Sequence, residues 1–226
     1  MKVIELENLP DVRINLKPNT RSRRITLRRS SRDGGFSVSY PSRAPFYEVE
    51  KFVRDHEGWI ARHFKPVHFI DIGSEIPFRG EMLNIVEGEK RGVRFHGDDL
   101  LVKSSNPGRA ISAALKSQAS LYALDRLDHF AALAKSHVNE IRWRDPKTRW
   151  GSCDTKGNIM LSWRLVMTPD WVFDYVIAHE VAHLIHMDHS HRFWNVVEEI
   201  YPEHMRARSY LKREGAKIQS ILFDKT

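Results

Sequence analysis

The chain has 226 residues, of which 41% are hydrophobic and 10% aromatic, so it can bury a core in one large or two small domains, and general disorder is excluded. No apolar run reaches the roughly 18 residues that span a bilayer, and residues 1–8 lack the apolar core of a signal peptide, so we expect no membrane partner and a cytoplasmic location. The formal net charge is +7, and the single cysteine, Cys153, excludes an internal disulfide and a thiolate zinc cluster.

Residues 1–106 are predicted to form an N-terminal β-rich region. Alternating apolar and polar residues predict short strands over residues 12–16, 25–27, 36–40, 76–86 and 93–102. A turn signal at residues 33–35 joins two of them, which indicates a small antiparallel sheet, and helical spacing follows over residues 45–63.

Arginines crowd the start of this region, at Arg21, Arg23, Arg24, Arg28, Arg29 and Arg32. Such a cluster can attract a nucleic acid or a nucleotide without reading sequence. Ile25 and Leu27 alternate with Arg24, Thr26 and Arg28, however, as in a strand with one buried face and one solvated face. The pattern favours a solvated basic face and keeps nucleic acid or nucleotide as alternative partners.

The pattern changes after Asn106-Pro107-Gly108, which we take as a domain boundary, so that residues 107–226 form the second domain. An Ala- and Leu-rich segment over residues 110–137 predicts one long helix that backs the next helix of the domain. Short strands are predicted over residues 140–144 and 159–165, with a turn at residues 156–158. The expected fold class is therefore α+β.

The strongest chemical signal is the sequence His179-Glu180-Val181-Ala182-His183. On a helix, residues four apart lie about 40° apart around the axis and roughly 6 Å along it, so both imidazoles can reach one metal ion with Glu180 beside it. The apolar sequence before His179 supports a helix, with Thr168 as its predicted cap and Pro169 at its first position.

A third histidine, His189, is the favoured third ligand. On a continuing helix it would lie too far from the same ion, so the helix must break near Asp188 and Ser190, and Ser190 can begin another helix. His186 and His191 remain rival ligands. Three neutral imidazoles with one open position are typical of catalytic zinc, whereas structural sites fill all four positions.

Several further motifs accompany these histidines, namely Arg149 to Cys153, Leu161 to Leu165, Asp174 to Val176, and His189-Ser190 followed by Phe193-Trp194. In their order along the chain they resemble the YgjP-like metallopeptidase family, whose members are relatives of the SprT-like zinc proteases. The resemblance covers most of the sequence. Asp188 departs from it, because the family often has Asn at that position.

The resemblance implies a compact zincin-like catalytic domain with a β-hairpin beside the metal helix, Zn²⁺ held by His179, His183 and His189, and Glu180 as general base. Hydrolysis of a peptide or protein substrate is the implied reaction, with Glu180 moving a proton from water to the leaving amine. Arg149, Trp150 and His191 are candidates for substrate or oxyanion contacts. A metal-dependent nucleotide hydrolase and a nucleic-acid-associated module with little activity are the alternatives.

Overall fold

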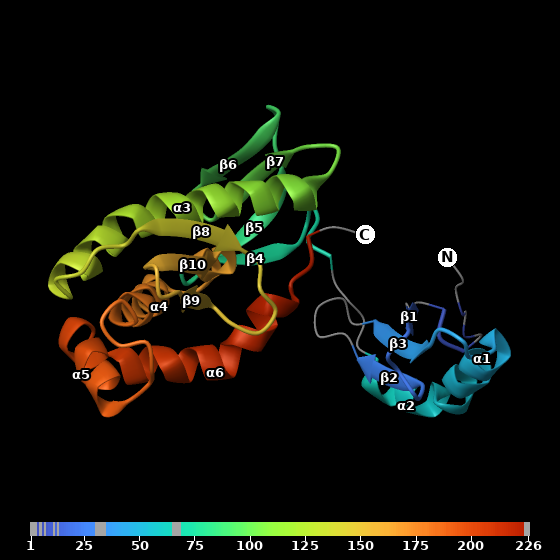
Figure 1. The fold of residues 1–226 in the computed structure, drawn as a ribbon. Helices are drawn as coiled ribbons and strands as arrows, with labels where there is room; N and C mark the ends of the chain where they lie inside the picture. The colour runs from blue at the N-terminus through green and yellow to red at the C-terminus, as the bar shows by residue number, and fades with distance from the viewer. Residues whose placement is uncertain are drawn as a thin grey trace. The chain divides into compact units, whose positions relative to one another are not determined.

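The computed structural model describes residues 4, 6, 8–10, 12, 14–29, 35–64 and 69–223, and the chain forms two compact units, Met1–His68 and Phe69–Thr226 (Figure 1). Both units combine sheets with helices, and the predicted α+β class is confirmed. The units divide at residue 68, whereas the sequence pattern placed the boundary at residue 106. Residues 69–106 instead pack into the core of the second unit.

The segment Asn106-Pro107-Gly108 begins a helix within that second unit. The side chain of Asn106 accepts a hydrogen bond from the backbone N–H of Arg109 at 3.0 Å, as an N-cap residue does, and Pro107 occupies the first helical position. The same residue types mark a domain linker or a helix start, and here they mark the helix start.

The first unit holds a three-stranded sheet made of β1 (Ile14–Asn19), β2 (Thr26–Arg29) and β3 (Phe36–Pro41). The sheet is mixed and not purely antiparallel as predicted, because β3 inserts between β1 and β2 and runs parallel to β1 and antiparallel to β2. Arg32 and most of the predicted turn, residues 33 and 34, lie outside the described residues.

Two helices, α1 (Phe46–Asp55) and α2 (Glu57–His63), replace the single helix predicted over residues 45–63, and the break falls at His56. Val49, Val53 and Ile60 of these helices are fully buried against Phe36 and Val38 of the sheet. The first unit therefore has its own small core, with the helices on one face of the sheet.

The second unit contains two sheets and four α-helices among its described residues. The strands of the first sheet, in the order β4-β5-β7-β6, are β4 (Glu75–Phe78), β5 (Glu81–Glu87), β6 (Gly92–His96) and β7 (Asp99–Lys103). The second sheet, in the order β8-β10-β9, contains β8 (Glu140–Arg144), β9 (Gly151–Cys153) and β10 (Asn158–Ser162). The helices are α3 (Pro107–Leu133), α4 (Asp170–Ala182), α5 (His191–Ile200) and α6 (His204–Ser220), and the short 3₁₀ helix η1 (Trp163–Met167) precedes α4.

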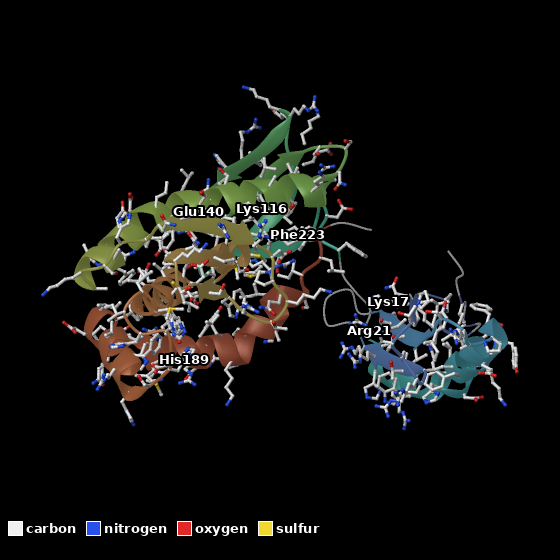
Figure 2. All side chains as sticks on the ribbon, viewed as in Figure 1. Lys17, Arg21, Lys116, Glu140, His189 and Phe223 are labelled. Atoms are coloured by element: carbon white, nitrogen blue, oxygen red, sulfur yellow. The ribbon has the colours of Figure 1, made fainter. Side chains whose placement is uncertain are left out.

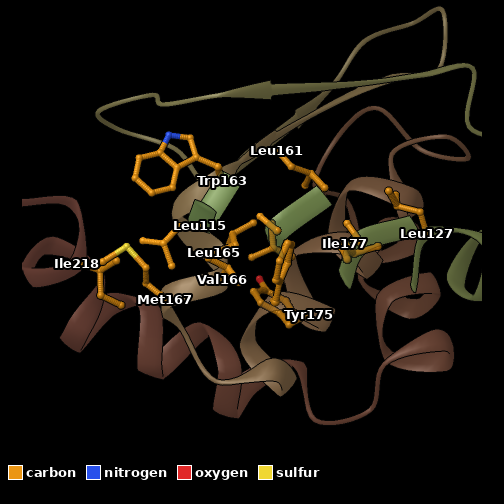
Figure 3. Packing of buried hydrophobic residues seen from close by; sticks show 14 of the residues in the cluster. Leu115, Leu127, Leu161, Trp163, Leu165, Val166, Met167, Tyr175, Ile177 and Ile218 are labelled. Carbon is orange, nitrogen blue, oxygen red and sulfur yellow. The ribbon is translucent and has the colours of Figure 1, made fainter. Parts of the chain in front are cut away.

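The core of the second unit surrounds α4. Leu115 and Leu127 of α3, Leu161 of β10, Leu165 of η1 and Ile177 of α4 belong to one buried cluster (Figure 3). Since α4 is apolar on nearly every side, it is held as a central helix and not as a surface helix. Among the described residues, no helix combines the length and the apolar character needed to cross a membrane.

Candidate metal centre

The helix α4 carries the first two histidines of the motif at its C-terminal end. It begins at Asp170 with Pro169 as N-cap, one position later than predicted, and Thr168 does not cap it. The Thr168 hydroxyl instead donates to the carbonyl of Leu165 at 2.6 Å. Eight apolar residues of α4 are buried, so the position of His179 and Glu180 is set by the packing of the whole helix.

The chain leaves the helical path immediately after the motif. His183 is the C-cap of α4, a full turn earlier than the break predicted near Asp188. A loop then leads to Ser190, which occupies the N-cap position of α5 as expected, although its side chain makes no capping hydrogen bond. Asp188 accepts from the N–H of Ser190 at 3.1 Å and so fixes the loop on both sides of His189.

The break brings three imidazoles together. One ring nitrogen from each of His179, His183 and His189 lies within 4.8 Å of the other two, and the Nε2 atoms of His179 and His189 are 3.2 Å apart. Two ligands at 2.0–2.1 Å from a tetrahedral zinc ion are separated by about 3.3 Å, so this spacing fits a shared ion. Of the three, His183 is buried and His189, labelled in Figure 2, is exposed.

A single aromatic ring supports all three imidazoles. The ring of Phe193, which is fully buried, lies 4.9 Å from His179, 4.4 Å from His183 and 4.8 Å from His189, measured between centroids. Phe193 is on the first turn of α5, so the start of this helix is packed directly against the histidine group. The ring of Trp194 lies farther out, 5.7 Å from His179 and 6.0 Å from His189.

The environment of His179 and His183 favours the neutral imidazole, which is the form that binds metal. Burial, followed by the neighbouring His183 and His189, lowers the pKa of His179 to about 3. Burial also lowers the pKa of His183, against an opposing hydrogen bond. In that bond, Nδ1 of His183 lies 3.0 Å from the carbonyl oxygen of His186, which fixes Nδ1 as the protonated nitrogen and leaves Nε2 free to bind an ion.

Glu180 is buried next to this group, with 5% of its surface exposed. Its Oε2 atom has no hydrogen-bond partner among the described residues. Burial raises the pKa of Glu180 to about 8, and the positive charge of Arg149 opposes the shift. A buried carboxyl group without a partner is costly, which is typical of groups that are kept for chemistry.

The backbone of β9 lies directly over Glu180. A Cβ atom on Gly151 would come within 2.6 Å of Cγ and 2.7 Å of Cδ of Glu180, closer than non-bonded carbon atoms approach. Only glycine fits at this position without displacing the carboxyl group. The backbone of β9 therefore restricts the position of the Glu180 carboxyl group.

The comparisons with known proteins agree with this geometry. Residues 23–214 match the family described as YgjP-like, metallopeptidase domain. The chain belongs to the YgjP-like metallopeptidase family. It is therefore a hydrolase of the metallopeptidase class, and its three-histidine group is compatible with a metal ion.

Similarity to individual proteins is more limited. The crystal structure of the metallopeptidase zymogen of Pyrococcus abyssi abylysin is 28% identical, and the match covers 43% of this chain and 96% of that chain with a TM-score of 0.37. No curated protein matches the chain.

The predicted substrate and oxyanion residues of this YgjP-like chain do not belong to the histidine cluster. Arg149 is exposed and acts on Glu180 through its charge, whereas Trp150 packs against Gly215 of α6. His191 is exposed at the start of α5, and neither His191 nor His186 belongs to the histidine cluster among the described residues. Burial raises the pKa of Cys153 to about 11, so its thiol stays protonated.

The contacts of three neighbours of the group were not predicted from the sequence, although Gly151 and Phe193 belong to motifs that carry the family resemblance. The close approach of Gly151 to Glu180 and the packing of Phe193 under the rings arise from contacts between distant segments. Arg208 of α6 is the third, because its guanidinium group lies 5.0 Å from the centre of the Trp194 ring and its charge lowers the pKa of His179. No pattern in the sequence distinguishes Arg208 from the other basic residues of α6.

Proposed function

We propose that the protein is a zinc-dependent peptidase in which His179, His183 and His189 hold the ion and Glu180 is the general base. The observation that carries the proposal is the 3.2 Å separation of the His179 and His189 Nε2 atoms, with His183 in the same cluster and Glu180 buried beside it. The donor set, three imidazoles with no thiolate, suits zinc with an open coordination position.

A bound Zn²⁺ would lower the pKa of a coordinated water to about 7 and polarise the carbonyl of the scissile bond. Only the ionised form of Glu180 can act as base, and the positive charges of Arg149 and of a bound metal ion favour that form against the effect of burial. Ionised Glu180 accepts the proton of the attacking water and then donates it to the leaving amine. Its confinement under Gly151 keeps the carboxyl group in one position, so little reorganisation is needed when the proton moves.

The free edge of β9 supports an extended substrate. Ser162 N–H donates to the Trp150 carbonyl at 2.8 Å and Asp154 N–H donates to the Asn158 carbonyl at 3.0 Å, so these residues of the hairpin pair inward. Because hydrogen-bonding direction alternates along a strand, Gly151 and Cys153 direct their N–H and C=O groups to the opposite edge, with which no described strand pairs. A peptide added there as a strand would pass beside Glu180.

The test compares the zinc-loaded protein with Glu180→Gln, using Glu199→Gln on the exposed side of α5 as the matched control. Each is incubated with an unstructured protein mixture and, separately, with a panel of nucleoside triphosphates. We expect new peptide termini from the wild type and the control, and a loss of about 10²- to 10⁴-fold in Glu180→Gln with zinc retained.

Full hydrolytic activity of Glu180→Gln would remove Glu180 from the role of base. Release of phosphate or pyrophosphate without new peptide termini would replace the peptidase by a nucleotide hydrolase.

A further inference from the structure

The excess of positive over negative charge in this protein lies almost entirely in its first unit. Residues 1–68 contain 14 Lys and Arg against 8 Asp and Glu, which gives +6 of the formal net charge of +7, whereas residues 69–226 contain 22 against 21. The imbalance is greatest over residues 14–32, where seven Lys and Arg occur without one Asp or Glu. The histidine group belongs to the second unit.

The described basic residues of this segment form what we call the basic strip, made of Lys17, Arg21, Arg23, Arg24, Arg28 and Arg29. All six are exposed, and none forms an ion pair or a side-chain hydrogen bond within the described part of the chain. The turn between β1 and β2 is held by other groups, since Arg21 N–H donates to the Asn19 side chain and the Ser22 hydroxyl donates to the Arg24 carbonyl. The guanidinium groups therefore form no bond that stabilises the described part of this unit.

The register of the sheet places part of the strip on a polar face. Lys17 of β1 and Thr26 of β2 both pair with Ser39 of β3, and Asn15 and Arg28 both pair with Ser37. Alternation puts these six residues on one face, opposite the apolar residues that pack against α1 and α2. The face combines two cations with hydroxyl and amide groups and contains no carboxylate. Figure 2 shows Lys17 and Arg21 at one end of this sheet.

We propose that the basic strip and the adjoining polar sheet face bind the phosphodiester backbone of nucleic acid. Five of the six cations are arginines, whose planar guanidinium group binds phosphate oxygens in pairs, and serine and threonine hydroxyls donate to the same oxygens. The contacts reach phosphates and not base edges, so the binding is independent of sequence.

The composition of the surface disfavours other anionic partners. A membrane-binding surface needs apolar side chains that enter the bilayer, and a stable protein interface needs aromatic anchors. The large exposed hydrophobic residue of the first unit, among those described, is Tyr47 on α1 and not on the sheet face. A polar and cationic surface without such anchors matches a hydrated polyphosphate chain.

The experiment measures binding of the full-length protein to a labelled DNA duplex of about 20 base pairs by fluorescence anisotropy, between about 50 and 200 mM salt. The test variant is R24E/R28E in the strip. The control is K51E/R62E on α1 and α2, which changes the net charge equally on the helical face. Circular dichroism checks that both remain folded.

We expect the wild type to bind with strong salt dependence and R24E/R28E to bind at least about 10-fold more weakly, with the slope of log K against log salt reduced by about 2, while the control changes less than about 3-fold. Equal weakening in both variants would reduce the effect to overall charge and overturn the proposal. Absence of wild-type binding, or binding to phosphatidylserine vesicles but not to DNA, would also overturn it.

Discussion

In the unit of residues 69–226, the buried Arg164 and the partly exposed Arg126 have ion-pair partners, whereas in the unit of residues 1–68 the basic strip is exposed and has no such partner among the described residues. Arg164 is 4% exposed and forms an ion pair with Asp145 at 2.7 Å, and the partly exposed Arg126 binds Asp174 through two hydrogen bonds of 2.8 and 2.7 Å. Glu180 is the exception, because it is buried and its Oε2 atom has no partner among the described residues.

The difference separates three uses of charge. Paired charges hold elements of the second unit together, the buried carboxyl of Glu180 is available for proton transfer, and the exposed cations, which have no partner among the described residues, are available to a ligand. If the comparison is right, substitution of Glu180 or of a paired charge in the second unit changes catalysis or stability, and substitution of a cation in the basic strip changes binding without changing either.

The largest effect is expected from removing a candidate ligand. His189→Ala deletes an exposed side chain and should leave the fold intact, but two imidazoles bind zinc far less tightly than three. Zinc affinity should fall by more than the 10- to 100-fold that is lost when a residue hydrogen-bonded to a ligand is removed. The zinc content after dialysis should therefore be a small fraction of the wild-type value. Peptidase activity should be lost with the metal.

His186→Ala is the matched control for this prediction. It changes the rival histidine but leaves the backbone carbonyl that accepts from His183. If His186→Ala loses zinc and His189→Ala keeps it, the ligand set is wrong.

A smaller effect, on stability, is expected from Arg164. Its guanidinium group donates to the carbonyls of Ile218 and Ile221 as well as to Asp145, and so ties the end of α6 to η1. Burial lowers the pKa of Arg164 to about 10, which still leaves it charged at neutral pH. Arg164→Met would remove the donor that Asp145 and two backbone carbonyls share, and should reduce the free energy of unfolding by about 3–5 kcal/mol.

Urea unfolding followed by tryptophan fluorescence measures this change, since Trp163 lies beside Arg164 with the guanidinium group 4.9 Å from its ring. Arg28→Met in the basic strip is the control and should stay within about 0.5 kcal/mol of the wild type. Equal shifts in the two variants would contradict the distinction between paired and unpaired charges.

Local patterns in the sequence predicted the features that depend on neighbours along the chain. Alternation marked β1, β3 and β10, and the spacing of His179, Glu180 and His183 marked a site on a helix. The order of the strands in the sheet could not be predicted from the sequence, because alternation tells which face of a sheet a residue occupies and not which strand lies beside it. For that reason the parallel pairing of β1 with β3 was missed.

The same limit applies to the site. The third histidine could be inferred because the helix had to break before His189, which is a local argument. The Phe193 ring packs against the imidazoles and the Gly151 backbone packs against Glu180 because α5 and β9 contact α4. No spacing within one segment of the sequence encodes those contacts. Asp174, which belongs to one of the motifs that carry the family resemblance, accepts hydrogen bonds from Tyr122 and Arg126 of α3, and this contact between distant segments is likewise not encoded by any local spacing.

The smallest of these effects comes from a single methyl group placed in each unit. Gly151→Ala puts a Cβ atom against Glu180, so the carboxyl group must shift while the histidines stay in place. A displacement of this kind should lower kcat by about 10- to 100-fold with zinc content unchanged. Gly58→Ala makes the same change in α2, where nothing lies within 4 Å of the new atom, and should leave kcat unchanged while stabilising the helix by up to about 1 kcal/mol. Normal turnover in Gly151→Ala would mean that Glu180 tolerates displacement and that the confinement of its carboxyl group by β9 is not needed for proton transfer.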